Sequence, residues 1–256
     1  WLRKLICEEN KSPVSNHTPR TQVTVFRLSS SAPRLYVGGM NCIVTAGPTY
    51  EPLDEVRRLT NMSTGRLGSL LASYLSARGH QVTLLMGHYA TWRGEQQAAT
   101  VETYTTTADL RDRLEKFSGN GVDAVFHAAA VSDFGFGKIY ERGADGTLQE
   151  LKAGKIPTRG TGLLAELVPT PKVIARLRPW FPQARIVGWK YEVDGDRDSV
   201  LERSREQIAA SRTDGCVANG PAYGFGFGVV AADGQHRHFS DTHELFAALE
   251  ALVLAK

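Results

Sequence analysis

The sequence predicts an α/β fold: a Rossmann-like, mostly parallel β-sheet flanked by helices, with a small β-hairpin near the C-terminus. Short apolar runs alternate with segments of helical period through most of the 256 residues, as in parallel sheets covered on both faces. An Asp233-Gly234 pair lies between two late β-like runs, which is a strong hairpin signal. Apolar residues make up 42% of the chain and charged residues 22%, which is typical of a globular domain.

The first half contains four expected strands and two expected helices. In the first helix, Leu67, Leu70, Leu71, Tyr74 and Leu75 recur at steps of three and four, and Gly79 follows as a stop signal. The second helix is expected to start at a Thr107 cap and to run to Phe117. The expected strands are 41–46, 81–86, 101–104 and 123–128.

The second half begins near Thr147 and continues the same alternation. A helix is expected to start at Pro171, because proline is favoured in a first helical turn. Further helices are expected over 198–210 and from about 242, where Leu245, Leu249 and Leu252 share one side. The expected strands are 163–167, 185–189, 215–218, 229–231 and 236–239.

Residues 1–39 differ from the rest of the chain. They are polar, Ser/Pro-rich and without a sustained period, and the first Met is Met40, directly before the first strand. We expect 1–39 to be a disordered extension or the product of a misplaced start, and 40–256 to be the functional domain. This segment carries six basic and two acidic residues, so the rest of the chain, out of a total of +3, has a net charge of −1. We therefore expect no nucleic-acid partner.

The cysteines and the hydropathy predict a cytoplasmic protein. Cys7, Cys42 and Cys216 are odd in number and far apart, so they form neither a disulfide framework nor a CxxC metal site. No run of about 18 apolar residues occurs, so we expect no membrane span.

Ligands of open parallel sheets bind beyond the carboxyl ends of the strands, which selects four loops. After the first strand come residues 47–57 and then 60–68, where hydroxyls, an amide and two glycines stand at a helix start that can hold an anion. The alternative is a simple helix cap. After the fourth strand, small side chains at 128–130 leave room for a base or sugar, and Asp133 is positioned to accept a ribose hydroxyl or to hold a metal; the alternative is a tightly packed sheet edge.

Two further loops carry charge and aromatic surface. Lys152, Lys155 and Arg159 suit a polyphosphate, although a solvated loop is the plainer interpretation. Trp189 is placed to stack on a base and Asn219 to donate to an acyl or phosphate oxygen; core packing and a turn are the alternatives. His127 lies within an apolar strand and is expected to be a core residue.

These segments occur together in an order that resembles phosphopantothenate–cysteine ligases. The matching stretches are VTAGPTYEPLD (44–54), TNMSTGRLG (60–68), AAAVSD (128–133), LVPTPKVI (167–174), VGWKYE (187–192) and DGCVAN (214–219). The resemblance covers about Met40 to Lys256. It implies a Rossmann-like fold, usually a homodimer, with 4′-phosphopantothenate, L-cysteine and CTP or ATP as substrates and Mg²⁺ on the phosphates. The acid is activated as an acyl-nucleotide with release of pyrophosphate, and the cysteine amine then displaces the nucleoside monophosphate; a separate decarboxylase acts downstream.

The resemblance also implies roles for individual residues. Asn61 and Lys155 match catalytic residues, with Asn61 handling the acyl-nucleotide and Lys155 on a mobile strap over the triphosphate; Lys152 is the alternative match for the strap lysine. Substrate binding falls to Asn61, Arg66 and Asn219, and no side chain is assigned as a metal ligand. The nucleotide-binding residues implied are Gly47, Ser63, Gly65, Ala129, Ala130, Asp133, Lys155, Pro171, Lys172, Val173, Ile174 and Trp189.

The sequence departs from this family at the phosphate grip. Two lysines of the bifunctional members correspond to Gln207 and Ser211 here, with Arg205 and Arg212 nearby as substitutes. This keeps two other hypotheses open. One is a non-catalytic paralogue that binds a nucleotide or phosphopantothenate. The other is an NAD(P)-dependent short-chain reductase, for which the expected GxxxGxG and Tyr-x-x-x-Lys are missing.

Overall fold

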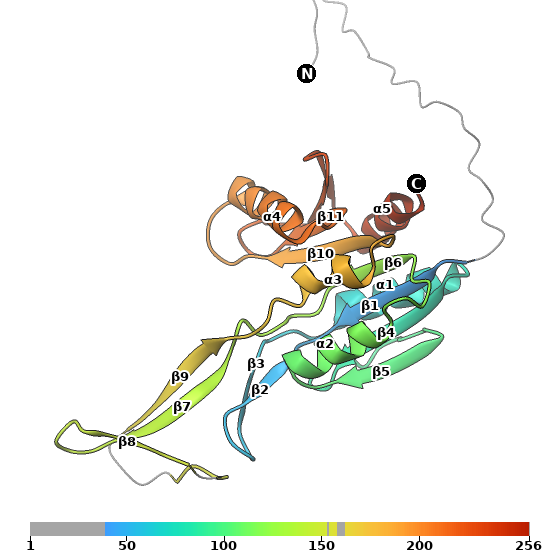
Figure 1. The fold of residues 1–256 in the computed structure, drawn as a ribbon. Coiled ribbons are helices and arrows are strands. Elements are labelled where there is room, and N and C mark those ends of the chain that lie inside the picture. The colour runs from blue at the N-terminus through green and yellow to red at the C-terminus, as the bar shows by residue number, and fades with distance from the viewer. Residues whose placement is uncertain (1–38, 153, 158–161, 256) are drawn as a thin grey trace, which may run out of the picture. The chain divides into compact units, whose positions relative to one another are not determined.

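The computed structural model describes residues 39–152, 154–157 and 162–255, all within the unit Val37–Lys256 (Figure 1). The expectations for 1–38 and for Arg159 therefore lie outside the described residues. In the described part of the chain, no helix is long and apolar enough to cross a membrane.

An eight-stranded sheet forms the centre of the fold, in the order β13-β12-β11-β10-β6-β1-β4-β5. The neighbours from β11 to β5 pair in parallel, and β12 and β13 are antiparallel. The predicted fold class and C-terminal hairpin are confirmed. The strands are β1 (Asn41–Ala46), β4 (Gln81–Gly87), β5 (Thr100–Tyr104), β6 (Ala124–His127), β10 (Arg185–Tyr191), β11 (Gly215–Asn219), β12 (Phe227–Ala231) and β13 (His236–Phe239).

Helices cover both faces of this sheet because alternate residues of each buried strand point to opposite sides. Val44, Phe126 and Val187 pack toward α1 (Arg66–Ala77) and α5 (Thr242–Leu254). Ile43, Val125 and Ile186 face α2 (Thr107–Lys116) and α3 (Ile174–Trp180). Cys216 and Ala218 pack with α4 (Arg197–Ser211) on that second side.

The chain reverses direction across the sheet at β1. The connection through α1 leads to β4 and β5 on one side of β1, whereas β6, β10 and β11 follow on the other side. The connections that leave β1 and β6 stay paired beyond the sheet, because Pro48 forms a parallel bridge with Ala130. The reversal of strand order at β1 marks this carboxyl edge as the place where doubly wound folds bind ligands in a crevice.

Two smaller antiparallel sheets were not predicted from the sequence. One joins β2 (Tyr50–Pro52) to β3 (Arg58–Thr60). In the other, β7 (Phe134–Arg142) pairs with both β8 (Leu148–Glu150) and β9 (Leu163–Pro169), and Figure 1 shows β7 and β9 side by side. The strand expected at 163–167 thus exists, but it pairs outside the central sheet.

The helix expected to start at Pro171 begins three residues later, at Ile174. Pro171 and Lys172 remain in the connection from β9 and are exposed there. The start-of-helix prediction was wrong because a proline that favours a first turn is equally compatible with an extended connection. Both residues are consequently free to face the crevice.

Candidate functional site

The N-terminus of α1 forms one wall of the crevice. Gly65 precedes the helix with a φ of 77°, a left-handed conformation that strains other residues, and a Cβ there would lie 3.0 Å from the Met86 sulfur. A Cβ on Gly68 would lie 2.6 Å from the Cβ of Ala46, so only glycine lets the first turn approach β1 this closely. The first turn has no acidic residue. The Arg66 amide donates to the Thr64 hydroxyl at 3.2 Å, so the amides that follow it in the first turn are the ones suited to an anionic ligand.

Asn61 connects this wall to the loop that follows β6. Its Nδ2 donates to the backbone carbonyl oxygen of Ala130 at 3.0 Å, and its side chain is exposed at the carboxyl edge of the sheet. Ser63 lies two residues further on, with its amide donating to the carbonyl of Asn61 at 2.9 Å. The structure therefore brings Asn61, Ser63 and Ala130 together, as a shared site requires.

The loop 128–133 is held along its length by the segment that follows β1. Its amides are used internally: Ala128 donates to the Thr45 carbonyl, Ala129 to the Thr45 hydroxyl and Ala130 to the Gly47 carbonyl, at 3.2, 3.1 and 2.9 Å. Because these three N–H groups already have acceptors, they are not open to a phosphate. It offers a rigid floor of small side chains that leads to Asp133.

Asp133 and Lys172 form an ion pair between the β6–β7 loop and the β9–α3 connection. Both side chains are more than half exposed, so this pair contributes little to stability. It does place a carboxylate and an ammonium group, predicted separately to contact a nucleotide, next to each other at the crevice. Val173, by contrast, is buried in the core beneath α3, so its side chain faces away from a ligand.

Trp189 and Asn219 carry buried polar atoms without a protein partner. Among the described residues, Trp189 Nε1 and Asn219 Oδ1 are buried and make no hydrogen bond. The strand register pairs Trp189 with Val217 and Tyr191 with Asn219, so both side chains point to the α1 face of the sheet. An unpaired buried donor or acceptor costs about 1–3 kcal/mol. A ligand or water molecule that bonds these atoms therefore gains free energy at this edge.

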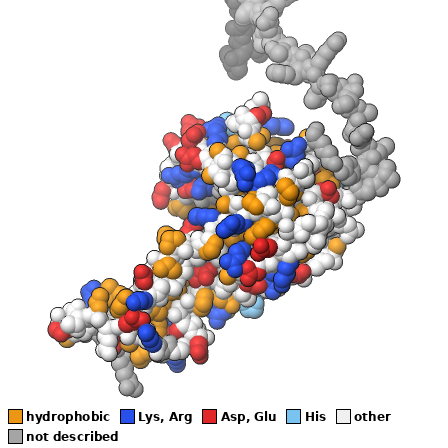
Figure 2. Space-filling model, in the orientation of Figure 1, with side chains coloured by type: hydrophobic (Ala, Val, Ile, Leu, Met, Phe, Trp, Pro, Cys, Tyr) orange, Lys and Arg blue, Asp and Glu red, His pale blue; other side chains and the backbone are white. Residues whose placement is uncertain are grey.

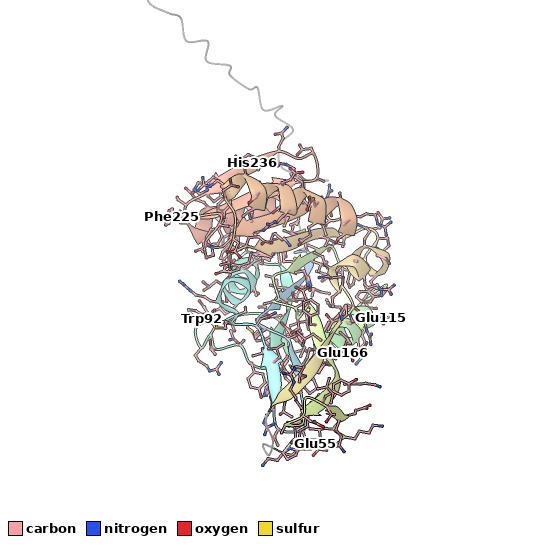
Figure 3. The ribbon with its side chains drawn as sticks, turned by 90° about the vertical axis from the view of Figure 1, so that its left-hand side faces the viewer. Glu55, Trp92, Glu115, Glu166, Phe225 and His236 are labelled. Carbon is pink, nitrogen blue, oxygen red and sulfur yellow. The ribbon has the colours of Figure 1, made fainter. Side chains whose placement is uncertain are left out.

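Lys155 lies on a different part of the structure. Its neighbours dock on the turn between β2 and β3: the amide of Ile156 donates to Asp54 at 3.1 Å, and the amide of Glu55 donates to the Gly154 carbonyl at 2.9 Å. Glu55, labelled in Figure 3, marks this turn. Within the described residues, the Lys155 ammonium group makes no hydrogen bond or ion pair and does not join Asn61 and Asp133.

Three other predicted positions have defined surroundings. The guanidinium of Arg66 lies over the ring of Trp92, 5.4 Å from its centroid, at the side of α1 where Figure 3 labels Trp92. Gln207 Nε2 lies 3.4 Å from the Cys216 sulfur, packed under Gly188, and Ser211 is buried. Of the proposed substitutes, Arg205 is bonded to Glu202 and to the Gly234 carbonyl on the β12–β13 hairpin.

Buried hydroxyl groups near the site were not predicted from the sequence. Thr45 Oγ1 lies 3.0 Å from Nδ1 of His127, which is buried as expected, and burial lowers the pKa of His127 to about 4. Burial also raises the pKa values of the Cys42 and Cys216 thiols to about 12, so neither is a reactive thiolate at neutral pH. The described residues contain no group of three His, Cys, Asp or Glu placed to hold a metal ion.

Fold and site together define a doubly wound α/β protein whose carboxyl edge combines an open helix N-terminus with a rigid loop floor and unpaired polar atoms. Residues 37–241 match the DNA/pantothenate metabolism flavoprotein C-terminal domain, and the chain belongs to that family.

The chain is 30% identical over 213 residues to the Coenzyme A biosynthesis bifunctional protein CoaBC of Thermococcus kodakarensis, covering 83% of this chain and 48% of the relative. With CoaBC of Bacillus subtilis the identity is 27% over 235 residues, covering 89% of this chain and 53% of the relative. The chain thus spans about half the length of these relatives.

Solved structures agree on the fold. The DNA/pantothenate metabolism flavoprotein from Streptococcus pneumoniae superimposes with a TM-score of 0.73 at 24% identity, over 85% of this chain and 99% of that chain. A mutant of Cab2 in complex with phosphopantothenate-cysteine has a TM-score of 0.61 at 19% identity, over 84% of this chain and 85% of that chain. These likenesses support the architecture described above.

Proposed function

We propose that this chain is a phosphopantothenate–cysteine ligase of coenzyme A biosynthesis. The acid and cysteine are joined through an acyl-nucleotide made from CTP or ATP, with pyrophosphate and a nucleoside monophosphate as by-products. The observation that carries the proposal is the hydrogen bond from Asn61 to the Ala130 carbonyl, because it joins the α1 wall to the loop that presents Asp133. Family membership and the relatives named Coenzyme A biosynthesis bifunctional protein support the same assignment.

In this proposal the protein positions reactants and offsets charge. The N-terminus of α1 holds phosphate oxygens, and the 128–133 loop supports the nucleoside. The unpaired Trp189 Nε1 and Asn219 Oδ1 form hydrogen bonds with polar atoms of the ligand. Asn61, already bonded to the loop floor, lies beside the acyl group as the cysteine amine approaches. Lys155 moves with the 154–157 strap to neutralise the triphosphate.

We infer that Mg²⁺ enters as part of the nucleotide substrate. Asp133 lies at the crevice as an exposed carboxylate. Mg²⁺ commonly binds through one or two carboxylates plus substrate phosphates, which fits a single carboxylate of this kind. The cation reduces the charge of the phosphates, while the protein's own residues orient them.

We further propose a cytoplasmic homodimer whose product is the substrate of a downstream decarboxylation. Exposed apolar side chains gather on the β7–β8–β9 sheet, including Phe134, Leu148, Leu163 and Leu167. Figure 2 shows hydrophobic side chains over the end of the molecule where Figure 1 places these strands. An apolar antiparallel sheet of this kind is suited to burial against a second copy.

A direct assay tests the ligase proposal. The full chain is mixed with 4′-phosphopantothenate, cysteine, Mg²⁺ and either CTP or ATP, and pyrophosphate is measured. We expect pyrophosphate release that requires both the acid and a nucleotide. If no pyrophosphate is released with either CTP or ATP, the assignment is removed.

A second candidate is a non-catalytic protein that binds a nucleotide or phosphopantothenate. It is favoured by one observation: Gln207 and Ser211 are uncharged and packed inward, where the resemblance implies lysines. The pyrophosphate assay, combined with calorimetry, separates the two candidates. A non-catalytic protein binds CTP, ATP or phosphopantothenate in the calorimeter but releases no pyrophosphate in the assay.

A further inference from the structure

Thr49 places a fully buried hydroxyl behind the loop that carries Asp133. It is 0% exposed, and its Oγ1 accepts the backbone N–H of Ser132 at 2.8 Å. The same oxygen accepts the hydroxyl of Thr107 at 3.3 Å and donates to the hydroxyl of Ser132 at 3.1 Å. A hydroxyl has one donor and two acceptor positions, so every hydrogen-bonding position of the Thr49 hydroxyl is used.

These bonds link segments that are far apart in sequence. Thr49 follows β1, Thr107 begins α2, and Ser132 lies directly before Asp133. On the other side of Asp133, Thr170 donates its hydroxyl to the Ser132 carbonyl and its amide to the Asp133 carbonyl. Thr170 in turn precedes Pro171 and Lys172, the second half of the ion pair at the crevice.

The Asp133 side chain has little packing of its own. It is 63% exposed, and the Lys172 side chain with which it pairs is 68% exposed. A pair this exposed does not fix its own position strongly. The location of the carboxylate is therefore set by the backbone at Ser132 and Asp133, which the buried Thr49 hydroxyl and the partly buried Thr170 hydroxyl hold.

We propose that Thr49 is a positioning residue for the nucleotide, acting through Ser132 to set where Asp133 and Lys172 meet the ligand. The inference rests on the proposed ligase function. It differs from the roles implied by the resemblance, because Thr49 is sealed from the crevice and touches no ligand. The consequence is that losing its hydroxyl disturbs nucleotide recognition before it disturbs the use of cysteine.

The first test needs no ligand. Hydrogen exchange at the Ser132 amide is measured in the free full chain for Thr49→Val and Thr49→Ser. Valine keeps the shape but removes the acceptor, so exchange should accelerate about tenfold or more, whereas serine should stay close to the wild type. Equal exchange in the two variants overturns the inference. If Thr49→Val does not fold, Thr49→Ala is compared with Thr49→Ser instead, because alanine removes the hydroxyl without placing a methyl group against Ser132.

The second test uses steady-state kinetics with whichever of CTP and ATP supports pyrophosphate release. Thr49→Val should raise the nucleotide KM about tenfold while the cysteine KM changes by less than about twofold, and Thr49→Ser should restore both. Thr107→Val is the matched control, since it removes one partner of Thr49 but leaves both bonds to Ser132, and should have a smaller effect. Equal increases in both KM values contradict positioning. A wild-type protein inactive with both nucleotides instead removes the ligase proposal, and the exchange comparison still decides whether Thr49 holds the loop.

Discussion

The side-chain amide of Asn61 donates to the backbone carbonyl of Ala130 across 3.0 Å, joining the segment before α1 to the loop after β6. The two residues are 69 positions apart in the sequence. Their contact lies beyond the carboxyl ends of the paired strands β1 and β6, so a ligand that meets one of these loops also meets the other.

Asn61→Asp should allow the acyl-nucleotide to form but block its transfer to cysteine. A carboxylate cannot donate to the Ala130 carbonyl and repels this oxygen, so the substituted side chain would no longer hold the acyl group for attack. The acyl-nucleotide is measured by rapid quench and mass spectrometry. Asn120→Asp is the control, because Asn120 also donates to a backbone carbonyl, that of Lys116, but lies in the connection that follows α2. Normal turnover by Asn61→Asp would show that its assigned role is wrong.

Lys155→Gln should raise the KM for the nucleotide far more than the KM for cysteine, by about tenfold against less than twofold. The lysine has no ion-pair partner among the described residues, so its charge is free for a triphosphate when the strap moves. Lys152→Gln serves as the comparison, since Lys152 lies in the same segment and pairs with Glu150 at 3.8 Å. Equal changes in both KM values would point to a folding defect instead.

Acid should destabilise the protein partly through His127. Burial lowers its pKa to about 4 from an ordinary value of 6.5, so the unfolded chain binds a proton between these values and the folded chain does not. Its contribution to stability is present above pH 6.5 and falls as the pH drops from 6.5 toward 4, by up to roughly 3 kcal/mol. Urea unfolding of wild type and His127→Leu across this range should give a shallower pH slope for the variant. Parallel slopes would show that His127 titrates normally.

Glu250→Gln should destabilise the fold without changing the nucleotide KM. Glu250 in α5 is held by Tyr74, Arg78 and His80, with contacts of 3.2, 2.6 and 3.0 Å. Burial alone would raise its pKa, but these hydrogen bonds outweigh burial and lower it. We expect a loss of about 2 kcal/mol in unfolding free energy, the range for hydrogen bonds to a charged group. Glu202→Gln, at an exposed pair with Arg205, should cost little, and an equal loss there would contradict this account.

The β7–β8–β9 sheet should mediate dimer formation. Leu167→Glu places a charge among its exposed apolar side chains and should shift the protein toward the monomer, measured by sedimentation velocity across a concentration series. Leu254→Glu changes another exposed leucine, on α5, and should leave the assembly unaltered. A wild-type protein that remains monomeric at all concentrations would remove the homodimer proposal.

The sequence by itself determined the central sheet. Strands such as Asn41–Ala46 and His236–Phe239 were predicted with their observed bounds, because uninterrupted apolar runs and an Asp-Gly turn are local signals. It also placed Asn61, Ala130 and Asp133 at one edge, since parallel strands end on the same side of a sheet.

Tertiary structure alone decided the rest. The pairing of β2 with β3 and of β7 with β9 depends on partners distant in the chain, and the sequence of β7 has glycines that weaken a local strand signal. The strap bearing Lys155 docks on the β2–β3 turn through one backbone bond, from Glu55 to Gly154, and one bond from the Ile156 amide to the Asp54 carboxylate; their partners lie about 100 residues apart in the chain. The hydroxyls of Thr45 and Thr49 look like ordinary strand and loop threonines in the sequence. Only the folded structure brings the amide of Ala129 to the Thr45 hydroxyl and the amide of Ser132 to the Thr49 hydroxyl. Because burial removes water from these groups, each needs its hydrogen bond within the protein.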